Sequence, residues 1–172
     1  MPASATALVT GATTDTGYHV ARRLCAHGHP VILVAAVEGE VDWIAAELIL
    51  NGADVRVVTC DIESGFGAPT VFAELAEDDV RVALIATHTG LTRGAECTQL
   101  KIDRHLSGLR VDGEVARGVT ALLLPGMLAR GRGQVVNLLS ATRYSSIALH
   151  SACAAANALM LSWSNTLAGD LQ

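Results

Sequence analysis

Few side chains in this sequence could work together as acids and bases, and their spacing is restrictive. The chain has a single lysine, Lys101, and two tyrosines, Tyr18 and Tyr144. Proton transfer by a tyrosine that a lysine activates would have to use these three residues. The residue four positions before Lys101 is Cys97, and Ala148 lies four positions after Tyr144. A lysine therefore never follows a tyrosine by one helical turn.

The histidines and cysteines do not show the spacing of a metal site. The four cysteines lie far apart and form no Cys-x-x-Cys pair, so we expect buried, reduced thiols. His27 and His29 stand next to Pro30, where a turn is the simpler interpretation. We predict no metal site.

The composition limits the class of protein. Hydrophobic residues make up 51% of the 172 residues and charged residues 17%, which excludes intrinsic disorder. The net charge of −5 argues against nucleic acid or an anionic membrane as the partner. No apolar stretch reaches the ~18 residues of a membrane span, and no signal peptide is visible. We therefore expect one cytoplasmic domain over residues 1–172.

The elements that must position any site alternate between apolar strands and amphipathic helices. The expected strands are 5–10, 31–37, 55–59, 80–86 and 135–139. The expected helices are 17–27, 41–51, 71–77, 109–130 and 151–167. Strands without polar alternation, separated by helices, predict a parallel sheet covered on both faces, in a doubly wound Rossmann-type α/β domain. We expect the strand order 3-2-1-4-5. The least regular segment, 89–107, should form a loop and a short helix.

A glycine-bearing turn follows the first expected strand. Residues 10–17 read TGATTDTG and lead into a helix, a placement in which backbone N–H groups can hold a pyrophosphate. The turn resembles the TGxxxGxG sequence of the short-chain dehydrogenase/reductase family. Further resemblances follow in order along essentially the whole chain: Asp61 after the third strand, Gly90 at the end of segment 87–90, and the passage 124–137.

The resemblance implies a dinucleotide cofactor and a set of site residues. The cofactor-binding positions would be Gly11, Thr13, Asp15, Gly17, Asp61 and Gly90. The family's catalytic asparagine, serine, tyrosine and lysine would correspond to Asp112, Ser140, His150 and Ala154. Three of these four positions depart from the family pattern, and the tyrosine–lysine pair is lost.

Asp15 is a further departure, because the family has a glycine there that lets the backbone approach the phosphates. A carboxylate ~4 Å from a phosphate, at an effective dielectric near 20, is repelled by ~4 kcal/mol before solvent relaxes. Asp15 could equally cap the following helix. We expect NADP(H) to bind weakly or not at all.

The C-terminal part of the sequence suggests association. Members of the family continue with two more strands, which this sequence lacks, so 135–139 would be an uncovered sheet edge that invites pairing. The last expected helix is apolar nearly all round, a profile that is usually buried. In the family this helix and the preceding long one form a subunit interface.

Three hypotheses remain open. The first is a non-catalytic, truncated subunit that holds a full-length reductase, or a second copy, through helices 109–130 and 151–167. By analogy, such subunits occur in polyketide and antibiotic pathways. The second is an altered enzyme in which His150 is the acid or base, Asp112 orients it and Ser140 positions a carbonyl oxygen. The third is a nucleotide-binding module without chemistry.

Overall fold

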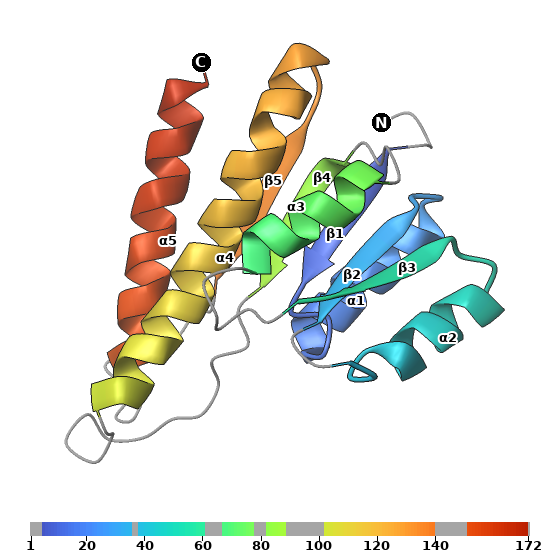
Figure 1. Cartoon of the computed structure of the whole chain (residues 1–172), viewed down its shortest axis with the longest axis horizontal. Coiled ribbons are helices and arrows are strands. Elements are labelled where there is room, and N and C mark those ends of the chain that lie inside the picture. Colours follow the sequence, from blue (N-terminus) through green and yellow to red (C-terminus); the bar gives the residue numbers. More distant parts are fainter. Residues whose placement is uncertain are drawn as a thin grey trace.

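The chain folds around a five-stranded parallel sheet, as a computed structural model of residues 1–172 shows. The structure describes residues 5–35, 38–60, 67–77, 82–88, 102–139 and 151–171. The strands are β1 (Thr6–Thr10), β2 (Val31–Ala35), β3 (Val55–Thr59), β4 (Val82–His88) and β5 (Gln134–Leu138). They lie in the order β3-β2-β1-β4-β5 (Figure 1). The expected α/β class with a parallel sheet is confirmed.

The described residues form five helices. They are α1 (Asp15–Ala26), α2 (Asp42–Leu50), α3 (Gly67–Glu77), α4 (Ile102–Ala129) and α5 (Ser151–Asp170). In Figure 1, α3 and α4 lie in front of the sheet, α1 lies behind it, and α5 stands beside α4, past the edge of the sheet. Among the described residues no helix is long and apolar enough to cross a membrane.

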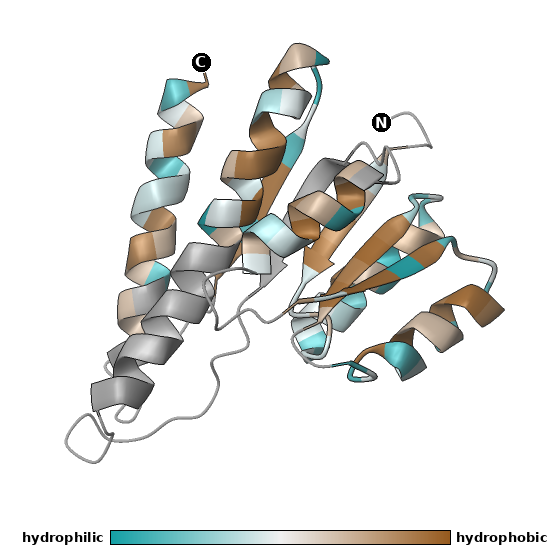
Figure 2. Cartoon of the chain, viewed as in Figure 1, coloured by the Kyte–Doolittle hydropathy of each residue, from teal (hydrophilic) through white to brown (hydrophobic). Residues whose placement is uncertain are grey.

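The alternation of side chains along β1 and β2 builds a core on each face. Ala7 and Val9 of β1 pack with Ile44 of α2 in one cluster. Leu8, between them, belongs to a second cluster with Val71 of α3. Successive side chains of a strand point to opposite faces, so a continuous apolar strand needs cover on both. Figure 2 shows these strands as hydrophobic along their length.

Several expected boundaries were wrong, and each has a local reason. The first helix begins at Asp15 rather than Gly17, because Thr14 is its N-cap. The long helix begins at Ile102 rather than 109, so the short helix expected within 89–107 is the first part of α4 and not a separate element. The glycine at 108 does not interrupt it, because a glycine inside a helix costs only ~1 kcal/mol.

The last helix is more exposed than its apolar sequence predicted. Met160 is buried, but Leu159 is 43% exposed, and Ala155 and Ala158 are also exposed. Figure 1 shows why: α5 packs beside α4, beyond the β5 edge, with no strand behind it. Burial of this helix in a subunit interface, which the family resemblance implies, stays a prediction.

Candidate functional site

The glycine turn lies at the carboxyl end of β1, the edge where ligands bind in open α/β sheets. Gly11 has a φ of 67°, in the left-handed region that favours glycine. Its carbonyl accepts hydrogen bonds from the backbone N–H of Thr14 at 3.1 Å and from the Thr14 hydroxyl at 2.8 Å. The turn is thus closed by its own backbone and by one side chain.

Gly17 holds the turn against α1. A Cβ atom at this buried position would lie 2.1 Å from the carbonyl oxygen of Gly11, which leaves no room for any side chain. Packing of the turn on the helix therefore requires a glycine here whether or not a nucleotide binds. The two glycines that support a cofactor site are also explained by the fold.

Thr14, rather than Asp15, caps α1. The Thr14 hydroxyl oxygen accepts a hydrogen bond from the Gly17 N–H at 3.1 Å. This bond uses one of the helix N-terminal donors that would otherwise be available to an anion. The expectation that Asp15 is the cap is corrected. Aspartate and threonine both occur often at N-caps, so residue preference alone does not choose between the two positions.

Asp15 lies in the first turn of α1 and is exposed. Its carboxylate stands at the positive end of the helix dipole, an arrangement typically worth ~0.3–1 kcal/mol of stabilisation. A phosphate placed at the same helix end would meet this negative charge. Thr13, the neighbouring position implied by the resemblance, is exposed in the turn.

Tyr18, one of the two tyrosines, is engaged in a structural contact. Its hydroxyl donates to the carboxylate of Glu47, at 2.7 Å to Oε1 and 3.0 Å to Oε2, which ties α1 to α2. Its ring lies 5.9 Å from that of Trp43 in a stacked arrangement. The hydrogen bond to Glu47, with burial and the negative charge of Glu47, raises the pKa of Tyr18. A lysine neighbour would lower the pKa of a catalytic phenol, so Tyr18 has the opposite environment.

The remaining predicted site residues are not placed by the structure. Asp61, Gly90, Ser140 and His150 lie outside the described residues. Asp112 is within α4, but its side chain is not described. The structure therefore brings together only Gly11, Thr13, Asp15 and Gly17. In the described ranges no group of three or more His, Cys, Asp or Glu side chains could hold a metal ion.

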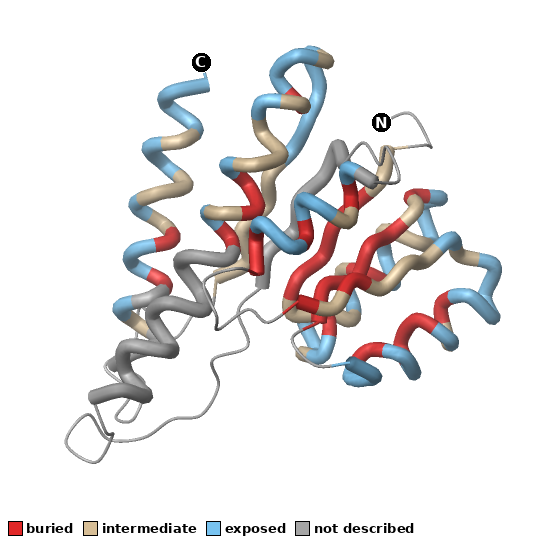
Figure 3. Tube along the Cα trace, in the orientation of Figure 1, coloured by how far each residue is buried: buried red, intermediate tan, exposed pale blue. Residues whose placement is uncertain are grey.

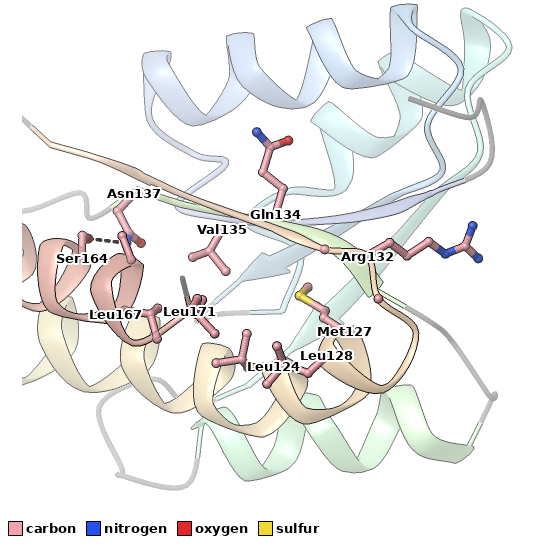
Figure 4. Close-up of a pocket in the computed structure, with 13 residues that line it drawn as sticks. Leu124, Met127, Leu128, Arg132, Gln134, Val135, Asn137, Ser164, Leu167 and Leu171 are labelled. Atoms are coloured by element: carbon pink, nitrogen blue, oxygen red, sulfur yellow. Dashed lines mark hydrogen bonds between the residues drawn. The ribbon is translucent and has the colours of Figure 1, made fainter.

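A cavity of about 460 Å³ lies elsewhere, between the C-terminal parts of α4 and α5 and the strand β5. Sequence reasoning did not single out its residues. Figure 4 shows Leu124, Leu167 and Leu171 around it, with the Asn137 amide donating to the Ser164 hydroxyl at 2.6 Å. It extends along the start of β5, near the amino ends of the strands, whereas the glycine turn lies at their carboxyl ends. It is therefore not the cofactor site of the resemblance.

Comparison with known proteins agrees with this fold. The chain is 26% identical over 137 residues to Oxidoreductase UcpA of Escherichia coli K12, covering 80% of this chain and 52% of that protein. A crystal structure of an actinorhodin polyketide ketoreductase variant with NADPH superposes with a TM-score of 0.89 at 26% identity, covering 98% of this chain and 65% of that one. A short-chain dehydrogenase from Streptomyces avermitilis has a TM-score of 0.87 at 25% identity, with 98% and 61% covered.

The chain spans about half the length of the curated relatives it matches. Residues 5–172 match the family described as short chain dehydrogenase. The match includes the strand, the glycine turn and the helix described above. This chain belongs to the short-chain dehydrogenase family.

Proposed function

We propose that this chain is a non-catalytic member of its family, which associates with a full-length short-chain reductase and supports it. The observation that carries the proposal is the absence of a tyrosine–lysine couple. The single lysine never follows a tyrosine by one helical turn, and the phenol of Tyr18 is bonded to a carboxylate. Without that couple the family's usual proton donor is missing.

The retained turn is consistent with weak NADP(H) binding or none. Gly11 and Gly17 are required by packing, Thr14 occupies one N-terminal donor, and Asp15 adds a negative charge. The actinorhodin ketoreductase variant carries NADPH. The glycines alone do not extend that property to this chain, because the fold explains them.

Exposed apolar side chains on α4 and α5 support association through helices 109–130 and 151–167. Leu128 is 58% exposed and Leu159 is 43% exposed. A hollow of about 410 Å³ between the two helices is lined by Arg117, Ala121 and Trp163, among others. An interface on these two helices would cover both leucines and the hollow. The likeness to a polyketide ketoreductase makes ketoreduction or alcohol oxidation in a polyketide or antibiotic pathway the setting we propose.

Co-purification with a full-length short-chain reductase of the same organism tests the proposal. We expect a stable complex that Leu159→Glu weakens at least ~tenfold, since a charge buried at an interface is costly. Leu50→Glu is the matched control: Leu50 is 87% exposed on α2, away from the proposed interface, and should not affect the complex. A monodisperse monomer that binds no reductase would contradict the proposal.

The alternative is a divergent NAD(P)-dependent oxidoreductase in which His150, Ser140 and Asp112 act in place of the usual residues. In the sequence Ser140 follows the last residue of β5 by two positions, and the carboxyl end of β5 belongs to the edge of the sheet where ligands bind in this class of fold. The replacement His150→Ala distinguishes the two proposals. Pathway activity would fall if His150 were the acid or base and would be unchanged in a supporting subunit.

A further inference from the structure

The helix α2 has apolar side chains on the face that points away from the sheet as well as on the face that packs against it. Ile44 and Leu48 are buried in the core. Trp43 and Leu50 are 60% and 87% exposed, and Ala46, between them, is also exposed. Residues three and four positions apart share one side of a helix, so residues 43, 46 and 50 form one row, which we call the α2 stripe.

The tryptophan of the α2 stripe is held in place before any partner binds. The ring of Trp43 stacks on that of Tyr18, with 5.9 Å between the ring centroids. The hydroxyl of Tyr18 in turn donates to the carboxylate of Glu47 at 2.7 Å. Tryptophan often dominates the binding energy of an interface, and a side chain that is already held loses little freedom on binding.

The α2 stripe lies far from the surface proposed for the reductase. α2 packs on β3, which is the opposite edge strand from β5 in the sheet order. Figure 1 shows α2 and α5 at opposite ends of the molecule. Both surfaces can therefore be occupied at once, and an inference about α2 does not rest on the proposed function.

Charge is distributed unevenly over the face that α1 and α2 form together. Each helix joins two neighbouring parallel strands, so both begin at the same end of the sheet. The exposed acids Asp15, Glu40 and Asp42 lie at that end, in the first turns of the helices or just before α2. The exposed bases Arg22 and Arg23 lie toward the other end of α1. The α1–α2 face is thus acidic at one end, basic at the other and apolar along α2.

Such a face is complementary to a copy of itself turned end for end. In a two-fold symmetric dimer each copy uses the same surface patch, so the patch must complement itself. In the antiparallel arrangement Ala46 lies near the two-fold axis, where its small side chain lets two helices approach closely. Leu50 then faces Trp43 of the second copy, and each acidic end meets a basic end.

We propose that the α1–α2 face is a homodimer interface, in which the α2 stripes of two copies of this chain pack antiparallel. Helices of 12 and 9 residues give a contact at the small end of specific interfaces, below about 1,200 Å² in total. The dimer therefore has a dissociation constant in the micromolar range, about 1–100 μM.

Sedimentation velocity of the purified chain at about 1 to 200 μM tests the dimer. We expect a concentration-dependent monomer–dimer equilibrium that Leu50→Glu weakens at least ~tenfold, because the contact would bury the new charge. Leu50 is exposed, so this variant should fold. Leu159→Glu, on the exposed side of α5, is the matched control and should leave the dimer unchanged. A chain that stays monomeric throughout, or equal weakening by both changes, would overturn the inference.

Charge-reversed variants test the antiparallel arrangement. The first carries Arg22→Glu and Arg23→Glu, and the second carries Asp15→Lys, Glu40→Lys and Asp42→Lys. Each alone brings like charges together at both ends, so we expect its dimer to be at least ~tenfold weaker. Each replacement in the second variant changes the charge by two units, which brings the net charge from −5 to about +1. That change alone would favour association, so a weaker dimer points to the ends themselves.

Mixing the two variants should restore a dimer, because both ends then meet opposite charges. Adding Leu50→Glu to both variants should abolish the mixed dimer, which a general attraction between the two chains would not require. Failure to form a mixed dimer, or a mixed dimer that Leu50→Glu leaves intact, would overturn the arrangement.

The reductase complex keeps this inference separate from the proposed function. Leu50→Glu should remove the homodimer and leave reductase binding unchanged, and Leu159→Glu should do the reverse. A homodimer that Leu159→Glu dissociates and Leu50→Glu does not would overturn the inference. A homodimer that Leu50→Glu dissociates, without any reductase complex, would support the inference and contradict the proposed function.

Discussion

The centre of the sheet, formed by β1 and β2, is covered on both faces, whereas the edge formed by β5, with α5 beside it, is more exposed. All five residues of β2 are buried, while none of β5 is, and Figure 3 shows the contrast along the chain. At the opposite edge, β3 has one buried residue. The difference teaches that side chains complete the core at the centre of the sheet and leave its edges partly exposed. Substitutions at the centre should change stability, and substitutions on the β5 side should change association.

Gly17→Ala should give the largest effect, because the new Cβ would lie 2.1 Å from a backbone oxygen that cannot move without opening the turn. We expect a loss of roughly 3 kcal/mol or more in the free energy of unfolding, measured by denaturant titration. Gly169→Ala, on the open α5 with no atom within 4 Å of the new Cβ, is the control. It should be neutral or slightly stabilising. Equal losses of unfolding free energy in the two variants would contradict the proposed difference between the two regions.

The same change made in both regions compares them directly. Val34→Ala, in β2 at 2% exposure, should cost about 2 kcal/mol of unfolding free energy through lost burial and a cavity. Val135→Ala, in the half-buried β5, should cost less than about 1 kcal/mol. The pair is measured by thermal or denaturant unfolding. A larger loss at Val135 would mean that β5 is already covered in solution.

Asp15→Asn tests whether the negative charge of the Asp15 carboxylate weakens dinucleotide binding at the glycine turn. Removing the carboxylate should strengthen NADPH binding about tenfold, which is well below the unscreened repulsion because the position is exposed. Fluorescence titration with NADPH measures it, and Asp170→Asn, at the end of α5, is the control. An unchanged affinity would show that the Asp15 charge does not limit binding.

Glu47→Gln should have the smallest effect. The carboxylate of Glu47 raises the pKa of Tyr18 above its ordinary value of 10.0, so the variant should lower that pKa. Since the folded pKa is raised, the associated stabilisation is present at neutral pH and is lost as the pH rises through the pKa of Tyr18. Ultraviolet titration of the phenol measures the shift, with Tyr18→Phe identifying the signal. A pKa that stays raised would mean that Glu47 is not its cause.

The sequence predicted the strands and helices better than it predicted which surfaces pack against them. Continuous apolar runs such as Val31–Ala35 have one stable solution, a strand covered on both faces, so the parallel sheet could be predicted. The exposure of α5 could not be predicted, because an apolar helix sequence indicates that the helix is buried without indicating which surface covers it. The cavity beside β5 could not be predicted either, because residues distant in the sequence, such as Leu124 and Leu171, form it together.

At the candidate site, the sequence placed a glycine turn after the first strand, and the roles of its residues in cofactor binding stay predictions. The need for Gly17 comes from its close approach to the Gly11 carbonyl, which only the three-dimensional structure reveals. The hydrogen bond from Tyr18 to Glu47 joins residues 29 positions apart, so no local sequence pattern could predict it. Ser140 and His150 remain predictions of the resemblance.

The central proposal is that this chain does not carry out the family's proton transfer, because no lysine follows a tyrosine by one helical turn in its sequence. The most direct measurement incubates the purified chain alone with NADPH and a set of ketones and ketoacyl thioesters, and follows loss of reduced nicotinamide by absorbance. We predict a rate no greater than that without protein, and a measurable rate once the full-length reductase is added. Turnover by the chain alone, lost in a His150→Ala variant, would contradict the account and establish a different catalytic solution.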